Sequence, residues 1–227
     1  MEAPELAPQP KYEDVARMLE HMVVRPELTE DDVRAGCDLA RAYGIAAIVI
    51  RQSDADAVVR WMEGTGVAVA SLVGLPHGSS TTPAKLYETR DLLRRGVREI
   101  DVVMNVGKLI ARQFQYLETE LRQVADACHE SGGVLKVIVQ GAYLAEDLKT
   151  IACKIVKRAG ADFASVSPED VPLMKRLLND RARIKIGEIE TLAEVLAARE
   201  AGAARVGTVA TSAILDEWKA KLLEGGL

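Results

Sequence analysis

The sequence has few aromatic residues, few cysteines, no long hydrophobic run and no strong excess of either charge. Aromatic residues make up 4% of the 227 residues, and the net charge is −5. Because no block of basic residues is present, alone or interleaved with aromatics, we expect no nucleic-acid partner. No apolar run approaches the length of a membrane span, so we expect no membrane partner either.

The three cysteines also argue against several kinds of chemistry. Cys37, Cys128 and Cys153 are odd in number and fall in segments with helical patterns. Their spacing is not that of metal ligands or redox pairs, so reduced thiols packed in a cytoplasmic protein are expected. Since no His, Cys and carboxylate cluster has metal-ligand spacing, we expect neither a metal nor another cofactor.

The chain begins with a proline-rich segment that is not a signal peptide. Residues 1–10, MEAPELAPQP, contain three prolines and lack both a basic region and an apolar region. A disordered arm is therefore predicted over residues 1–11, followed by one domain over residues 12–227.

Short runs rich in β-branched residues alternate with longer amphipathic segments along this domain. Helical patterns such as 30–43 and 114–130 separate the runs, and no shift in composition marks a domain boundary. This alternation predicts a single-domain α/β fold, a TIM (β/α)₈ barrel. An open doubly wound sheet is the alternative, although it usually has fewer strands at this length. The eight predicted strands lie around 21–24, 45–50, 67–72, 99–104, 134–139, 162–166, 183–186 and 204–207.

Charged residues occupy positions inside these strands where a purely structural core would be apolar. Side chains alternate along a strand, so Asp101, Lys136 and Lys185 converge if their faces point into the barrel. Two lysines and an aspartate suit attack of an amine on a carbonyl, because a second cation lowers the pKa of a lysine. The aspartate could then relay protons. A structural ion pair bracing the interior accounts for the same residues, and spacing does not decide between the two.

Ordered motifs after residue 15 together resemble the deoxyribose-phosphate aldolase family. The resemblance implies a class I carbon–carbon lyase that cleaves 2-deoxyribose 5-phosphate reversibly into acetaldehyde and glyceraldehyde 3-phosphate through a Schiff base. The resemblance thus implies a cytoplasmic protein of deoxyribonucleotide and carbohydrate catabolism. Its substrate would be a small carbonyl or sugar compound, and a homodimer is left as an open alternative for its assembly. The motifs are LEHMVVRPELTEDDV (19–33), VGLPHGSSTT (73–82), EIDVVMNVG (99–107), LKVIVQ (135–140), GADFASVS (160–167), IKIGEIET (184–191) and AARVGT…SAIL (203–215).

The resemblance also assigns roles to individual positions. It implies that Asp101 is the proton-relay aspartate, that Lys185 is the second lysine tuning the nucleophile, and that Lys136 is the interior lysine of the fifth strand. The Schiff-base lysine of the family would fall at Ser165, and a hydroxyl cannot form an imine. We therefore expect that the family's reaction does not run at this position.

The phosphate-binding positions are altered in a similar way. The resemblance assigns Gly187, Gly207 and Thr208 to this region, but the glycine-rich loop after the sixth strand is shortened. Glu190 stands where the family has an arginine. A phosphate needs N–H groups, hydroxyls and cations, so we expect phosphate binding to be lost or displaced.

Two functional hypotheses follow from these departures. The first is an inactive relative that keeps a binding or assembly role on the barrel scaffold. The second is a repurposed lyase in which Lys185 or Lys136 supplies the amine and Asp101 the acid and base. Its substrate would be an unphosphorylated or cationic carbonyl compound.

Overall fold

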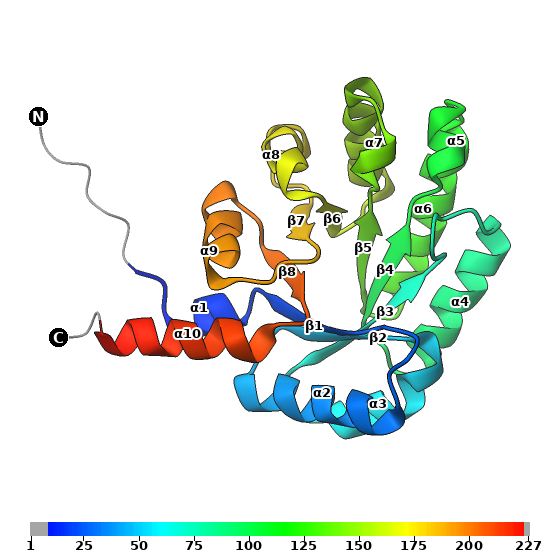
Figure 1. Ribbon diagram of the computed structural model, residues 1–227. Coiled ribbons are helices and arrows are strands. Elements are labelled where there is room, and N and C mark those ends of the chain that lie inside the picture. Colours follow the sequence, from blue (N-terminus) through cyan, green and yellow to red (C-terminus); the bar gives the residue numbers. More distant parts are fainter. Residues whose placement is uncertain (1–8, 225–227) are drawn as a thin grey trace, which may run out of the picture.

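The chain folds into a closed barrel of eight parallel strands surrounded by helices (Figure 1). The computed structural model describes residues 9–224. Each strand pairs with the next, and β8 pairs with β1 to close the barrel. The fold class predicted from the sequence is thus confirmed. The predicted disordered arm, residues 1–11, lies for the most part outside the described residues.

The strands and helices alternate in chain order. The strands are β1 (Leu19–Val23), β2 (Ala47–Ile50), β3 (Ala68–Val73), β4 (Glu99–Val103), β5 (Val134–Ile138), β6 (Phe163–Val166), β7 (Arg183–Ile186) and β8 (Arg205–Thr208). The longer helices are α2 (Glu30–Tyr43), α3 (Ala55–Met62), α4 (Thr82–Arg94), α6 (Phe114–Glu130), α7 (Glu146–Ala159), α8 (Val171–Leu178), α9 (Leu192–Ala201) and α10 (Thr211–Glu224). The short ones are α1 (Tyr12–Ala16), α5 (Val106–Ile110) and the 3₁₀ turns η1 (Gln52–Asp54), η2 (Gly141–Tyr143) and η3 (Pro168–Asp170).

Local sequence signals set the ends of several helices. The Thr29 side chain caps the first turn of α2, and Gly44 ends the helix with a left-handed φ of 62°. Gly160 ends α7 in the same way at φ 79°. Glycine suits these positions because it has no Cβ to clash in the left-handed region. These signals set where each helix ends, so that the chain can turn back into the next strand of the barrel.

The packed interior has two parts. A large apolar layer lies between the outer faces of the strands and the ring of helices. Inside the barrel, a small apolar group on β1, β2 and β3 includes Ala47, Val49 and Ala70, with Met22 and Leu72 beside it. The charged residues of the interior come from β4, β5, β7 and β8, together with Glu20 of β1. The candidate site lies where the apolar and charged parts meet.

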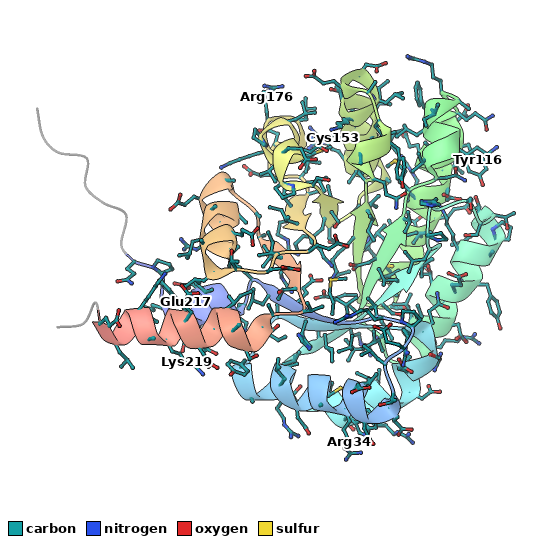
Figure 2. The ribbon with its side chains drawn as sticks, viewed as in Figure 1. Arg34, Tyr116, Cys153, Arg176, Glu217 and Lys219 are labelled. Atoms are coloured by element: carbon teal, nitrogen blue, oxygen red, sulfur yellow. The ribbon has the colours of Figure 1, made fainter. Side chains whose placement is uncertain are left out.

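The outer surface of the helical ring is polar. Figure 2 shows Arg34, Arg176, Glu217 and Lys219 on this surface, and all four side chains are exposed. Within residues 9–224, no helix combines the length and the apolar character needed to cross a bilayer.

The three cysteines are free and buried, as expected from the sequence. Burial raises the pKa of Cys37 and Cys153 to about 11, and that of Cys128 to about 12. Because the thiolate is the reactive form, we expect all three to resist a thiol reagent such as Ellman's reagent in the native protein. All three should react after unfolding in guanidinium, and rapid native labelling would contradict this expectation.

Candidate active site

Lys136 lies at the centre of a buried charge cluster inside the barrel. Its ammonium contacts Glu20 Oε2 at 2.8 Å, Glu99 Oε2 at 2.8 Å and Asp101 Oδ1 at 2.9 Å, and its side chain is 0% exposed. Burial would lower the pKa of Lys136, but the three carboxylates raise it above its ordinary value. Lys136 is therefore held as an ammonium with no access to the solvent.

Lys185 lies beside Lys136 and shares its carboxylate partners. Its amine forms an ion pair with Asp101 Oδ2 at 2.5 Å and another with Glu20. The convergence of Asp101, Lys136 and Lys185 predicted from strand alternation is confirmed by these contacts. Unlike Lys136, Lys185 also reaches the cavity at the mouth of the barrel.

The cluster is balanced in charge. Arg205 extends it, since its guanidinium lies 3.7 Å from both Glu20 Oε1 and Glu99 Oε1. Three carboxylates (−3) thus face three cations (+3: Lys136, Lys185 and Arg205), which leaves a net charge of zero. Such balance is what allows charges to persist in a buried interior.

Glu20 makes the stability of the barrel sensitive to acid. Burial would raise the pKa of Glu20, but the charges of Lys136 and Lys185 lower it from 4.5 to about 2. A carboxyl whose pKa is lower in the folded state stabilises the fold above its unfolded pKa and loses this effect as the pH falls.

We expect the free energy of unfolding to decrease by on the order of 2 kcal/mol between neutral pH and about pH 3 through this group. Urea titrations across this range would measure the decrease, and a Glu20→Gln variant should show a shallower pH dependence. Equal slopes for both proteins would contradict the assignment.

A cavity of about 400 Å³ opens at the mouth of the barrel. Asp101, Ser165 and Lys185 lie at its charged side. Ser165 and Lys185 are direct neighbours across the β6–β7 pairing, and Ser165 is 7% exposed. A second group of lining residues is apolar and comprises Met22, Val24, Val49, Leu72, Leu75, Ile138, Val139 and Val166. Gln140, Ser167, Gly187 and Glu188 complete the lining.

The positions assigned to phosphate binding lie on β7 and β8 or directly after them. Gly187 lines the cavity, and a Cβ at Gly207 would lie 3.0 Å from Met22 Sδ and 3.6 Å from Gly187 Cα. The backbones of the two strands therefore approach closely here. Thr208 is 1% exposed, and its hydroxyl accepts a hydrogen bond from the Ala210 N–H at 2.9 Å. The Thr208 hydroxyl is therefore already hydrogen-bonded within the protein.

The N-terminus of α9 is capped by the side-chain carboxylate of Glu194, a residue of the first turn of this helix. Glu194 accepts hydrogen bonds from the backbone N–H of Thr191 at 2.9 Å and of Glu190 at 3.2 Å. The Thr191 hydroxyl caps the Glu194 N–H in return, which completes a capping box. The N–H groups of Glu190, Thr191 and Glu194 at this helix end are thus bonded within the protein.

The described residues contain no group of three or more His, Cys, Asp or Glu side chains placed to hold a metal ion. The histidine of β1, His21, instead contacts the Thr211 hydroxyl at 2.9 Å through Nδ1. Burial lowers the pKa of His21, which favours a neutral ring. His21 thus joins β1 to α10 and lies outside the charge cluster.

Comparison with known proteins places this chain in a family. No family model matches the sequence. Among curated proteins, the deoxyribose-phosphate aldolase of Caldanaerobacter subterraneus is 33% identical over 217 residues, covering 91% of this chain and 94% of its own. That of Thermococcus gammatolerans is 34% identical over 207 residues, covering 86% and 92%. The chain belongs to the deoxyribose-phosphate aldolase family.

Solved structures agree with this membership. An aldolase structure superposes with a TM-score of 0.86 at 26% identity, covering 92% of this chain and 98% of its own. The deoxyribose-phosphate aldolase of Aeropyrum pernix superposes with a TM-score of 0.85 at 24% identity, covering 93% of each chain, and supports the fold. The family is one of carbon–carbon lyases built on this barrel.

The sequence analysis missed three members of the charge cluster, Glu20, Glu99 and Arg205. The first strand was predicted around 21–24, whereas β1 runs over Leu19–Val23 and includes Glu20. Glu99 lies two residues before Asp101, so strand alternation alone could have placed it on the same face.

Proposed function

We propose that the protein binds a small unphosphorylated carbonyl or sugar compound at the barrel mouth and does not catalyse imine-based aldol cleavage. The observation that supports this most directly is that Ser165, which lines the cavity from β6 beside Lys185, ends in a hydroxyl. An imine needs a free amine, and Ser165 offers none.

The two interior lysines do not replace the missing amine in this proposal. Lys136 is fully buried and held by three carboxylates. Lys185 is held by Glu20 and Asp101. An ammonium in such ion pairs has no lone pair for attack on a carbonyl. The remaining cavity of about 400 Å³ still offers room and polar groups for a ligand.

Activity measurements test the catalytic half of the proposal. We expect no cleavage of 2-deoxyribose 5-phosphate in a coupled assay for glyceraldehyde 3-phosphate, run beside an active relative. Turnover at a rate near that of the relative would overturn the proposal.

Ligand binding tests the other half. Saturation-transfer NMR should detect 2-deoxyribose bound to the native protein. A Met22→Trp variant, which fills the cavity, should lose the signal, whereas Tyr87→Trp at an exposed position of α4 should keep it. Absence of binding to the native protein would remove the proposed role.

A second candidate function is a lyase in which Lys185 forms the imine. It is favoured by the position of Lys185 in the cavity wall beside Asp101, a group suited to proton transfer. Borohydride reduction in the presence of a small aldehyde, followed by peptide mapping, would place an adduct on Lys185 if this candidate is correct. With no adduct, the candidate fails.

We also propose a cytoplasmic protein that self-associates as a homodimer. Three free buried cysteines suit a reducing compartment. A relative of known structure, from Aeropyrum pernix, is described as a tetramer. Light scattering after gel filtration should give twice the monomer mass, and a monomer at micromolar concentration would contradict this part of the proposal.

A further inference from the structure

The mouth of the cavity over β7 and β8 lacks an available positive charge. In barrels of this kind, phosphate groups commonly bind near the loops after the seventh and eighth strands. Among the cavity-lining residues that the structure describes, Lys185 is the one cation, and it is already paired with two carboxylates. Glu188, on the loop after β7, adds a negative charge, is exposed, and forms no ion pair within residues 9–224.

Several backbone N–H groups near the mouth are already bonded within the protein. At the start of α9, the N–H groups of Glu190 and Thr191 are bound to Glu194. The Ile189 N–H is bound to the Gly207 carbonyl at 2.9 Å. Before α10, the Ala210 N–H is bound to Thr208. An anion at the mouth would have to displace these internal bonds.

The backbone holds Glu188 at the rim in spite of a local energetic cost. Its φ is 57°, in the left-handed region that disfavours residues with a Cβ. Residues other than glycine persist in this region when the surrounding structure imposes it, often at ligand sites. Glu188 therefore adopts a backbone conformation that glycine would adopt at a lower energetic cost.

Below the rim, the cavity wall is mostly apolar. Met22, Val49 and Leu72 line it from β1, β2 and β3, and Ile138 lines it from β5. Ser165 and Lys185 provide polar groups at the opposite wall. A ligand that fits this wall has a short hydrocarbon body and a hydroxyl or carbonyl at the end that reaches β6 and β7.

We infer that the ligand carries a cationic group, such as an ammonium, at the end that faces Glu188, in place of a phosphate. This inference rests on the proposed function, because it names the class of compound that the cavity binds. The cation would meet the unpaired Glu188 carboxylate, while the hydroxyl or carbonyl end would accept a hydrogen bond from the Lys185 ammonium. A phosphate in the same place would face the Glu188 carboxylate instead of a free cation.

Three matched alditols test the inference. They are 2-deoxyribitol, its 5-phosphate and its 5-amino-5-deoxy derivative, which carry a hydroxyl, a phosphate and an ammonium group at the same end. Alditols have no aldehyde and form no imine, so they measure binding without chemistry. We expect the native protein to bind the amine about two- to fivefold more tightly than 2-deoxyribitol in an NMR titration, as for an exposed ion pair. The phosphate should bind most weakly.

Variants at the rim assign the preference to one residue. Glu188→Gln should abolish the advantage of the amine over 2-deoxyribitol, and Glu188→Lys should turn it into an advantage for the phosphate. Glu200→Gln, an equal charge change at an exposed position of α9, should leave the order unchanged. Thermal unfolding would show that each variant keeps its fold.

The possible outcomes separate this inference from the function on which it rests. If 2-deoxyribitol binds and the amine binds no better, the inference fails while the binding role stands. Tighter binding of the phosphate by the native protein, or an unchanged order in Glu188→Gln, would also overturn it. If none of the three compounds binds, the inference is wrong. Cleavage of 2-deoxyribose 5-phosphate would overturn the proposed function whatever the order of binding.

Discussion

A Lys136→Met variant is expected to lose about 3–5 kcal/mol of the free energy of unfolding, the usual cost of breaking a buried ion pair from one side. Methionine fills a similar volume, so the loss comes from charge. The substitution leaves three carboxylates (Glu20, Glu99 and Asp101) facing two cations inside the barrel. An unpaired buried charge must either stay at high cost or take up a proton.

Urea or guanidinium titrations measure this loss. Lys154→Met on the exposed side of α7 is the matched control and should change the free energy of unfolding by less than about 0.5 kcal/mol. A Lys136→Met variant as stable as this control would show that the cluster contributes little to the fold. If the loss is partly a protonation effect, it should be smaller at low pH.

A Ser165→Lys variant is expected to gain an imine-forming amine. Borohydride reduction with acetaldehyde should leave an ethyl group on residue 165, whereas the native protein should show none there. The new amine would extend into the cavity next to Lys185, its neighbour across the β6–β7 pairing. A nearby cation disfavours protonation of the new amine, which keeps a fraction of it neutral and reactive.

Cleavage of 2-deoxyribose 5-phosphate by this variant should nevertheless remain ~100-fold or more below that of an active relative, because a poorly positioned substrate reacts slowly. Peptide mapping of the adduct, with Ser53→Lys as a surface control, separates reaction in the cavity from background labelling. Full turnover in Ser165→Lys would mean that the mouth still holds a phosphate. Absence of an adduct on residue 165 would mean that the cavity does not admit the aldehyde.

Much of the barrel could be predicted from the sequence because strand and helix patterns are local. The α2 bounds follow from Thr29 and Gly44, and β7 coincides with the predicted strand 183–186, where isoleucine alternates with charged residues. The meeting of Asp101 with Lys136 and Lys185 follows from alternation along each strand, once closure of the barrel is assumed.

The features that could not be predicted depend on contacts between distant segments. Glu20 belongs to β1 because its backbone pairs with Ala47 and Gly207, which no local pattern indicates. The hydrogen bond from the Glu190 N–H to Glu194 is different, because it joins residues four apart and accompanies a Thr191-to-Glu194 capping-box spacing that the sequence carries. The left-handed backbone of Glu188 comes from the shape of the loop after β7, since its sequence contains a glutamate where glycine is usual.

The capping box of α9 has a consequence for how this barrel could change during evolution. The Glu194 carboxylate both stabilises the helix and occupies the N–H groups of Glu190 and Thr191. A mutation of Glu194 would free these two donors and leave the Thr191 cap, but it would remove the reciprocal half of the capping box. An anion bound by these two donors would therefore replace an interaction that now stabilises the helix.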